Sequence, residues 1–111
     1  MQSFFFLSMK KIASIFIFSF AALFLNAQSK IRVHELNDEA ELLIAKKEYI
    51  EAIELLEKAL SIDTTLYRLY KNRANAYTKI DNDSLAKFDL DKAILLAPNE
   101  YDLYYLRGRI F

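Results

Sequence analysis

Five polar residues between positions 67 and 79 have the types and spacing needed to hold an anionic ligand. They lie off the apolar stripe of the helix expected there and are Arg68, Lys71, Asn72, Asn75 and Lys79. Lys71 and Asn75 are four residues apart, so their side chains project from one face of a helix. An ammonium and an amide that converge on one carboxylate give it charge-assisted hydrogen bonds. These residue types therefore favour the binding of an anionic ligand.

Residues for catalysis or metal binding are scarce in this chain. It has one histidine, His34, and no cysteine, which excludes thiolate sites and argues against a catalytic triad or a multi-histidine metal centre. Asp81 and Asp83 lie close together, but the glycine and terminal glutamate of a Ca²⁺ loop are missing. We therefore expect no enzymatic activity, no metal and no cofactor.

The composition favours a small all-α protein. The 111 residues include 15 basic and 15 acidic side chains, so no nucleic-acid partner is indicated. The chain has one glycine and one proline. Strands and phosphate-binding loops depend on these residues more than long helices do.

The N-terminal residues resemble a targeting segment. Lys10 and Lys11 precede an apolar run at residues 12–25, and the small residue Ala27 follows. This order is typical of a cleavable secretory signal, whereas a membrane-spanning helix needs about 20 apolar residues. We expect cleavage after Ala27 and a periplasmic or secreted product. An inner-membrane anchor formed by the uncleaved segment is the alternative.

The expected organisation follows from this segment and from a repeat. The expected parts are residues 1–8 as a start-site artefact before Met9, 9–27 as the signal peptide, 28–32 as a linker, and 33–111 as a helical array.

An internal repeat organises the helical array. Residues 33–66 align with residues 67–100, and a partial third repeat covers residues 101–111. Apolar residues within each repeat are spaced by three or four, which predicts two antiparallel helices per repeat and one lone helix at the end. Asp83 is expected to cap the second helix of the second repeat, and Asn99 with Asp102 to open the last helix as a capping box.

Residues 33–111 resemble the tetratricopeptide repeats. The resemblance rests on the period of about 34 residues, on YIEAIELLEKALSID (Tyr49–Asp63), and on two alanines seven apart that are followed by Pro98. It implies antiparallel helix pairs stacked as a short right-handed α-solenoid, with a concave groove lined by the first helix of each pair. Lys47 and Asp81 depart from the family pattern, because glycine is common at these positions.

The resemblance also implies that the groove binds a peptide or a partner helix through the five polar residues named above. Lys71 and Asn75 resemble part of the carboxylate clamp of some tetratricopeptide domains. The match is partial, because the equivalent residues of the first repeat are Asn37 and Glu41.

The charges of the two complete repeats differ. Residues 33–66 hold nine acidic and three basic residues, and residues 67–100 hold five acidic and six basic ones. This gradient favours a protein partner of mixed charge. We expect a protein-interaction scaffold of the bacterial cell envelope. The alternative is the N-terminal sensory or docking region of a larger envelope or signalling protein.

The last helix is expected to expose a packing face. Tyr104, Gly108 and Phe111 occupy the repeat positions that receive the second helix in the complete repeats. Two aromatic residues of this size bury on the order of 150–250 Å² each when they are covered. We therefore expect a truncated product or a homodimer formed through this face.

Overall fold

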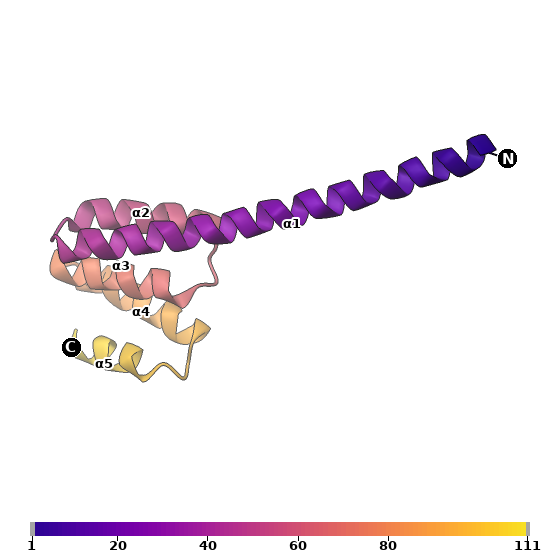
Figure 1. Cartoon of the computed structure of the whole chain (residues 1–111). Coiled ribbons are helices and arrows are strands. Elements are labelled where there is room, and N and C mark those ends of the chain that lie inside the picture. The colour runs from indigo at the N-terminus through magenta and orange to yellow at the C-terminus, as the bar shows by residue number, and fades with distance from the viewer. Residues whose placement is uncertain (1, 111) are drawn as a thin grey trace. The chain divides into compact units, whose positions relative to one another are not determined.

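The computed structural model describes residues 2–110, and no strand occurs in that range. Five helices follow one another along the chain (Figure 1): α1 Gln2–Ala45, α2 Tyr49–Ile62, α3 Tyr67–Lys79, α4 Asp83–Leu96 and α5 Tyr101–Arg109. The all-α prediction is confirmed.

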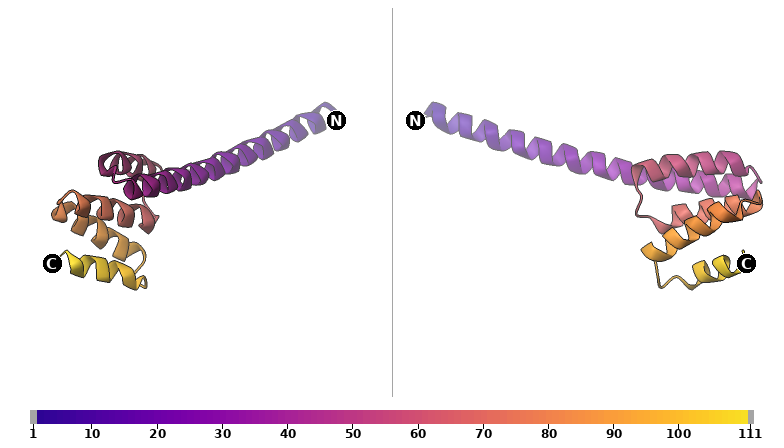
Figure 2. Two further views of the ribbon diagram at one scale, coloured as in Figure 1. Left: turned by 60° about the vertical axis from the view of Figure 1, so that its left-hand side comes forward. Right: turned by 180° about the vertical axis from the view of Figure 1, so that it is seen from behind.

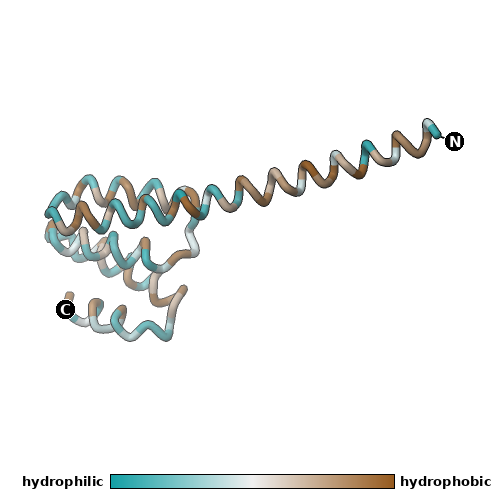
Figure 3. The backbone as a smooth tube through the Cα atoms, viewed as in Figure 1, coloured by the Kyte–Doolittle hydropathy of each residue, from teal (hydrophilic) through white to brown (hydrophobic). Residues whose placement is uncertain are grey.

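The chain divides into two compact units, one up to Ile31 and one from Arg32. Residues 2–31 are helical and exposed throughout, and apolar residues dominate them (Figure 3). The residues expected to form a linker, 28–32, are helical and belong to α1. By length and composition α1 can cross a membrane, and a signal sequence near the N-terminus passes the same test. The signal peptide and the start at Met9 stay predictions.

The unit from Arg32 onward is a row of antiparallel helices (Figures 1 and 2). The C-terminal part of α1 packs with α2, and α3 packs with α4. These two pairs correspond to the predicted complete repeats, and α5 is the lone first helix of the third.

Alanines form the close contacts inside each helix pair. Six of them are at most 1% exposed: Ala40, Ala52, Ala59, Ala74, Ala86 and Ala93. Small side chains at a crossing allow two helices to approach closely. Leu56 and Leu90, which lie between the alanines of α2 and α4, fill the remaining space.

A leucine at one repeat position joins each repeat to the preceding one. Leu69 at the start of α3 is fully buried in the core of the first repeat, and Leu103 of α5 is fully buried in that of the second. Burying a leucine contributes about 1.5–3 kcal/mol. Ile110 packs against the same second cluster.

A buried ion pair fixes α3 against α4. Arg73 donates two hydrogen bonds of 2.8 Å to the two carboxylate oxygens of Asp89, whose exposed fraction is 1%. The hydrogen bond to Asp89 raises the pKa of Arg73 above its ordinary value. Loss of one partner would leave a buried charge alone, at a cost of about 3–5 kcal/mol. The first repeat has Glu39 and Leu55 at these positions, so the pair is a feature of the second repeat.

Two predicted helix caps are wrong. The N-cap of α4 is Asn82, whose side-chain oxygen accepts a 3.3 Å hydrogen bond from the amide of Leu85. Asp83 is instead the first residue of α4, where its negative charge interacts favourably with the positive end of the helix dipole.

The capping box expected from Asn99 and Asp102 is absent from the start of α5. The N-cap there is Glu100, which makes no side-chain capping bond. The carboxylate of Asp102 accepts a hydrogen bond from Lys71 of α3 instead. A tertiary partner has therefore replaced the local one.

Left-handed backbone conformations close the turns within both helix pairs. Lys47 has a φ of 64° and Asp81 a φ of 61°. Residues with a side chain pay about 1–2 kcal/mol in this region, and glycine does not. The strain explains why glycine is common here in the family that the sequence resembles.

Lys47→Gly and Asp81→Gly are expected to raise the free energy of unfolding by up to about 1 kcal/mol each. Glycine adopts a positive φ without the steric strain that the Cβ of Lys47 or Asp81 causes. Denaturant unfolding measures the change. Lys46→Gly is the matched control, because Lys46 has no positive φ and should gain nothing. Equal stability of all three variants would contradict the interpretation.

Candidate functional site

One position of the repeat carries a residue of different charge in the first helix of each repeat, and these three residues form a row. Glu41 of α1, Asn75 of α3 and Arg109 of α5 each lie one repeat length from the next. They occupy equivalent positions on three stacked helices. The row therefore passes from a carboxylate through an amide to a guanidinium.

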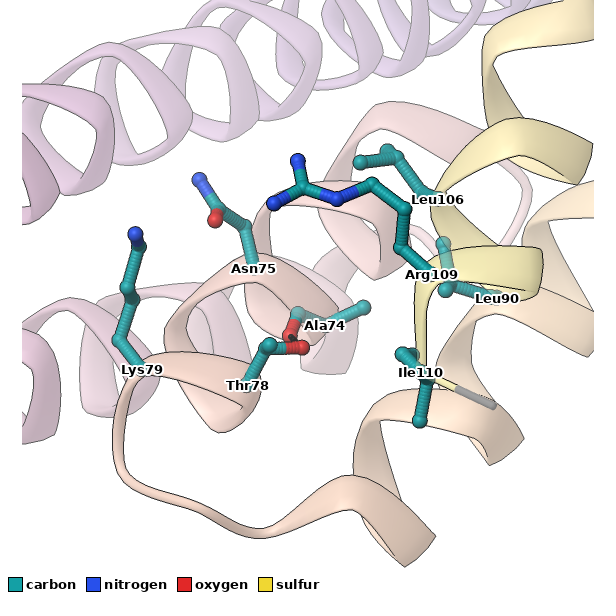
Figure 4. A pocket seen from close by; sticks show the side chains of 8 residues that line it. All are labelled: Ala74, Asn75, Thr78, Lys79, Leu90, Leu106, Arg109 and Ile110. Atoms are coloured by element: carbon teal, nitrogen blue, oxygen red, sulfur yellow. Dashed lines mark hydrogen bonds between the residues drawn. The ribbon is translucent and has the colours of Figure 1, made fainter.

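A pocket of about 110 Å³ lies at the basic end of this row, between α3, α4 and α5. Figure 4 shows its eight lining residues: Ala74, Asn75, Thr78, Lys79, Leu90, Leu106, Arg109 and Ile110. A cavity of about 150 Å³ can hold benzene, so this one has room for a small aliphatic side chain.

The rim of the pocket is basic. Asn75 and Lys79 reach it from α3 and Arg109 from α5, while Leu90, Leu106 and Ile110 supply apolar surface (Figure 4). The guanidinium of Arg109 lies 5.8 Å from the ring centre of Tyr105. Among the residues that line the pocket none is acidic. The pocket therefore suits an anionic group next to an aliphatic one.

Lys71 is already engaged by a carboxylate of this chain. Its ammonium forms an ion pair with Asp102 of α5, and this hydrogen bond holds the pKa of Asp102 below its ordinary value. A ligand carboxylate at Lys71 would have to displace Asp102. The clamp formed by Lys71 and Asn75 stays a prediction; here Lys71 pairs with Asp102, while Asn75 lines the pocket.

Asn72 belongs to a network that links α3 to α1. Its amide donates hydrogen bonds of 2.8 Å to the side-chain oxygen of Asn37 and 2.9 Å to the carboxylate of Glu41. Asn37, only 3% exposed, donates a further 3.2 Å bond to Glu41. These bonds satisfy Asn72 internally. Arg68, the fifth candidate, is exposed and does not line the pocket.

The residue that sequence reasoning missed is Arg109. It lies in the partial third repeat, where the clamp positions hold Asp102 and Leu106 and predicted no binding residue. The signal was present, because Arg109 stands at the repeat position of Asn75.

The packing face predicted on α5 is exposed where the structure describes it. Tyr104 is 39% exposed, and a Cβ placed on Gly108 would meet nothing within 4 Å. Phe111, the third residue of that prediction, lies outside the described residues.

Comparisons with known proteins identify the fold. No family model matches the chain, and a search of curated proteins found no match. Among solved structures, the second tetratricopeptide-repeat domain of Spaghetti (RPAP3), bound to the HSP90 peptide SRMEEVD, has 29% sequence identity and a TM-score of 0.71. The match covers 75% of this chain and 77% of that one. Residues 32–110 have the tetratricopeptide-repeat fold.

The first tetratricopeptide-repeat domain of the same protein, also bound to SRMEEVD, is 25% identical with a TM-score of 0.69, over 71% of this chain and 63% of that one. The tetratricopeptide-repeat fold is a protein-interaction scaffold, and both of these solved domains hold a peptide. Within residues 2–110 no group of three or more metal-binding side chains occurs.

Replacement of Lys71 by methionine is expected to raise the pKa of the Asp102 carboxyl toward its ordinary value, because the hydrogen bond that stabilises the charged form is lost. In the native chain the folded pKa lies below the unfolded one. The pair therefore stabilises the fold above the unfolded pKa of about 3.9, and this contribution disappears as the pH falls through the folded pKa.

NMR titration of the Asp102 carboxyl carbon tests this, with Lys79→Met as the control that leaves Asp102 unchanged. An unshifted Asp102 in Lys71→Met would contradict the pairing.

Proposed function

We propose that this domain is a protein-interaction module of the bacterial cell envelope, which binds an acidic peptide segment in the groove of α1, α3 and α5. The observation that carries the proposal is the pocket formed by Asn75, Lys79 and Arg109 above an aliphatic floor. The fold of this domain matches domains that were solved with the HSP90 peptide SRMEEVD. The last four residues of that peptide are three acidic residues and one valine.

The charge row sets the direction of the bound segment. The guanidinium of Arg109 favours carboxylates at the α5 end, whereas the carboxylate of Glu41 disfavours them at the α1 end. Glu41 accepts hydrogen bonds from two asparagines at Oε1, so its other carboxylate oxygen can accept a hydrogen bond from a donor group of the ligand. A segment of mixed charge, with its acidic end at the pocket, fits this row.

The pocket and the clamp can be separated by mutation, with labelled SRMEEVD peptide as the probe. Lys79→Ala and Arg109→Ala are each expected to weaken binding by about three- to tenfold, since each removes a charge-assisted contact. Arg68→Ala is the control and should bind normally. Fluorescence anisotropy on the full chain, at low and high salt, gives the affinities.

Lys71→Ala distinguishes the two sites. The pocket predicts unchanged affinity, because Asp102 already occupies the ammonium, whereas the clamp predicts a loss. Absence of peptide binding, or equal binding by the Lys79, Arg109 and Arg68 variants, would contradict the proposed groove.

We also infer that the chain is exported through residues 9–27. Support comes from Lys10 and Lys11 ahead of the apolar run and from the length of α1. N-terminal sequencing of the exported product is expected to begin at Gln28. A membrane-bound product that retains Met9 would instead support an uncleaved anchor, and an uncleaved product in the cytoplasm would refute export.

A further inference from the structure

One side of α4 carries a stripe of exposed apolar side chains, away from the buried apolar residues of the helix. The stripe consists of Leu85, Phe88, Lys92 and Leu95, which follow one another at intervals of three, four and three residues. On a helix these intervals place side chains along one face. Leu85, Phe88 and Leu95 are 42%, 56% and 77% exposed. The ammonium of Lys92 lies 5.8 Å from the ring centre of Phe88. We call these four residues the α4 stripe.

The repeat itself does not require an apolar stripe at these positions. The equivalent residues of α2 are Glu51, Glu54, Lys58 and Ser61. All four are exposed, although α2 is followed by α3 and α4 and packs with α3. These positions therefore stay open to solvent when a further repeat follows, so helices stacked after α5 would leave the α4 stripe exposed too. Adjacent large apolar groups on a surface are typical of an interaction site.

The spacing of the α4 stripe is that of a coiled-coil seam. Leu85 and Lys92 take a positions of the heptad, and Phe88 and Leu95 take d positions. Two heptads on free helices would be too short to associate stably. Here α4 is already held in helical form by its packing with α3 and α5. The stripe is therefore a preformed surface for one further helix.

The α4 stripe is complementary to a second copy of itself in the antiparallel direction. Its spacing reads the same from either end, so Leu85 faces Leu95 of the second copy and Phe88 faces Lys92 of the second copy. Each ammonium then lies over an aromatic ring of the other chain, which is a cation–π contact. In the parallel direction the two Lys92 residues would face each other, and their like charges would oppose association.

The charges of α2 are compatible with the same arrangement. Since α2 and α4 occupy equivalent places in successive repeats, the two-fold axis that relates two copies brings α2 toward α2 of the second copy. Glu54 and Lys58 have the spacing of Phe88 and Lys92, so Glu54 faces Lys58 of the second copy. Opposite charges therefore meet there. Exposed pairs of this kind are weak, and the apolar α4 stripe supplies most of the affinity.

We propose that the α4 stripe joins two copies of this chain as an antiparallel dimer, whose two-fold axis passes between Phe88 and Lys92. This contact differs from the one predicted from the sequence, which used Tyr104 and Gly108 of α5. None of the four stripe residues lines the peptide pocket, so both grooves of the dimer remain free. The stripe has far fewer residues than the roughly 20–30 per side of a standard interface. The dimer is therefore weak and depends on concentration.

Sedimentation equilibrium of the full chain in density-matched detergent micelles measures the dimer. Phe88→Lys is expected to raise its dissociation constant at least about tenfold, because this lysine faces Lys92 of the second copy. Leu42→Lys is the matched control: Leu42 of α1 is an exposed leucine outside the stripe, so the native affinity should be kept. Equal thermal melting of the two variants by circular dichroism shows that both fold.

Introduced cysteines report the direction of packing, because the chain has none of its own. A mixture of Leu85→Cys and Leu95→Cys chains is expected to form a disulfide-linked dimer on oxidation. Each variant alone should cross-link much less. In the antiparallel dimer two copies of the same position are about 15 Å apart along the helix axes, at 1.5 Å per residue, which is beyond the reach of a disulfide.

Three results would overturn the proposal. A dimer that Phe88→Lys leaves unchanged would lie elsewhere, for example at Tyr104 and Gly108. Stronger cross-linking of Leu85→Cys alone than of its mixture with Leu95→Cys would refute the antiparallel direction. A native chain that stays monomeric would refute the dimer, and a blue shift of Phe88→Trp fluorescence on lipid vesicles would then assign the stripe to a membrane surface.

Discussion

The close approach of paired helices through alanine is the constraint on which the rest of this domain depends. Ala40 meets α2 and Ala74 meets α4 with almost no surface left exposed. A larger residue at either site would separate the helices and displace the leucines between them. The spacing of the first helices, and with it the groove and its pocket, is set by these contacts and by Leu69 and Leu103, which join the repeats.

The helices and their pairing could be predicted because burial imposes two periods on the sequence, a short one within each helix and a long one from repeat to repeat. The caps could not. Asn82 and Asp83 are adjacent and both have cap-forming side chains, so the sequence does not say which residue the backbone leaves outside the helix. Asp102 has the spacing of a capping residue, yet it contacts Lys71 on a different helix.

The sequence predicted the candidate site as a polar face of α3, but it did not predict which side chains of the neighbouring helices those residues bind. Helical spacing grouped five polar residues on α3, but Lys71 and Asn72 bind side chains of α5 and α1 respectively. Asn75 and Lys79 are left to line the pocket. Arg109 was not predicted, because the partial third repeat contains only one helix and little internal pattern. Side-chain pairing between repeats depends on the stacking of helices, which no single helical period encodes.

The one glycine of the chain lies inside α5, and this has a consequence for motion. Glycine in a helix interior is less favourable than alanine by about 1 kcal/mol, and here no covering side chain offsets it. Local unfolding starts where buried contacts are fewest, and Leu103 is the one buried residue of α5, so we expect transient opening of residues 32–110 to be concentrated in α5. Hydrogen exchange would therefore be faster there than in α3. Any ligand that contacts α5 also slows this exchange, so occupancy of the domain is coupled to the order of its last helix.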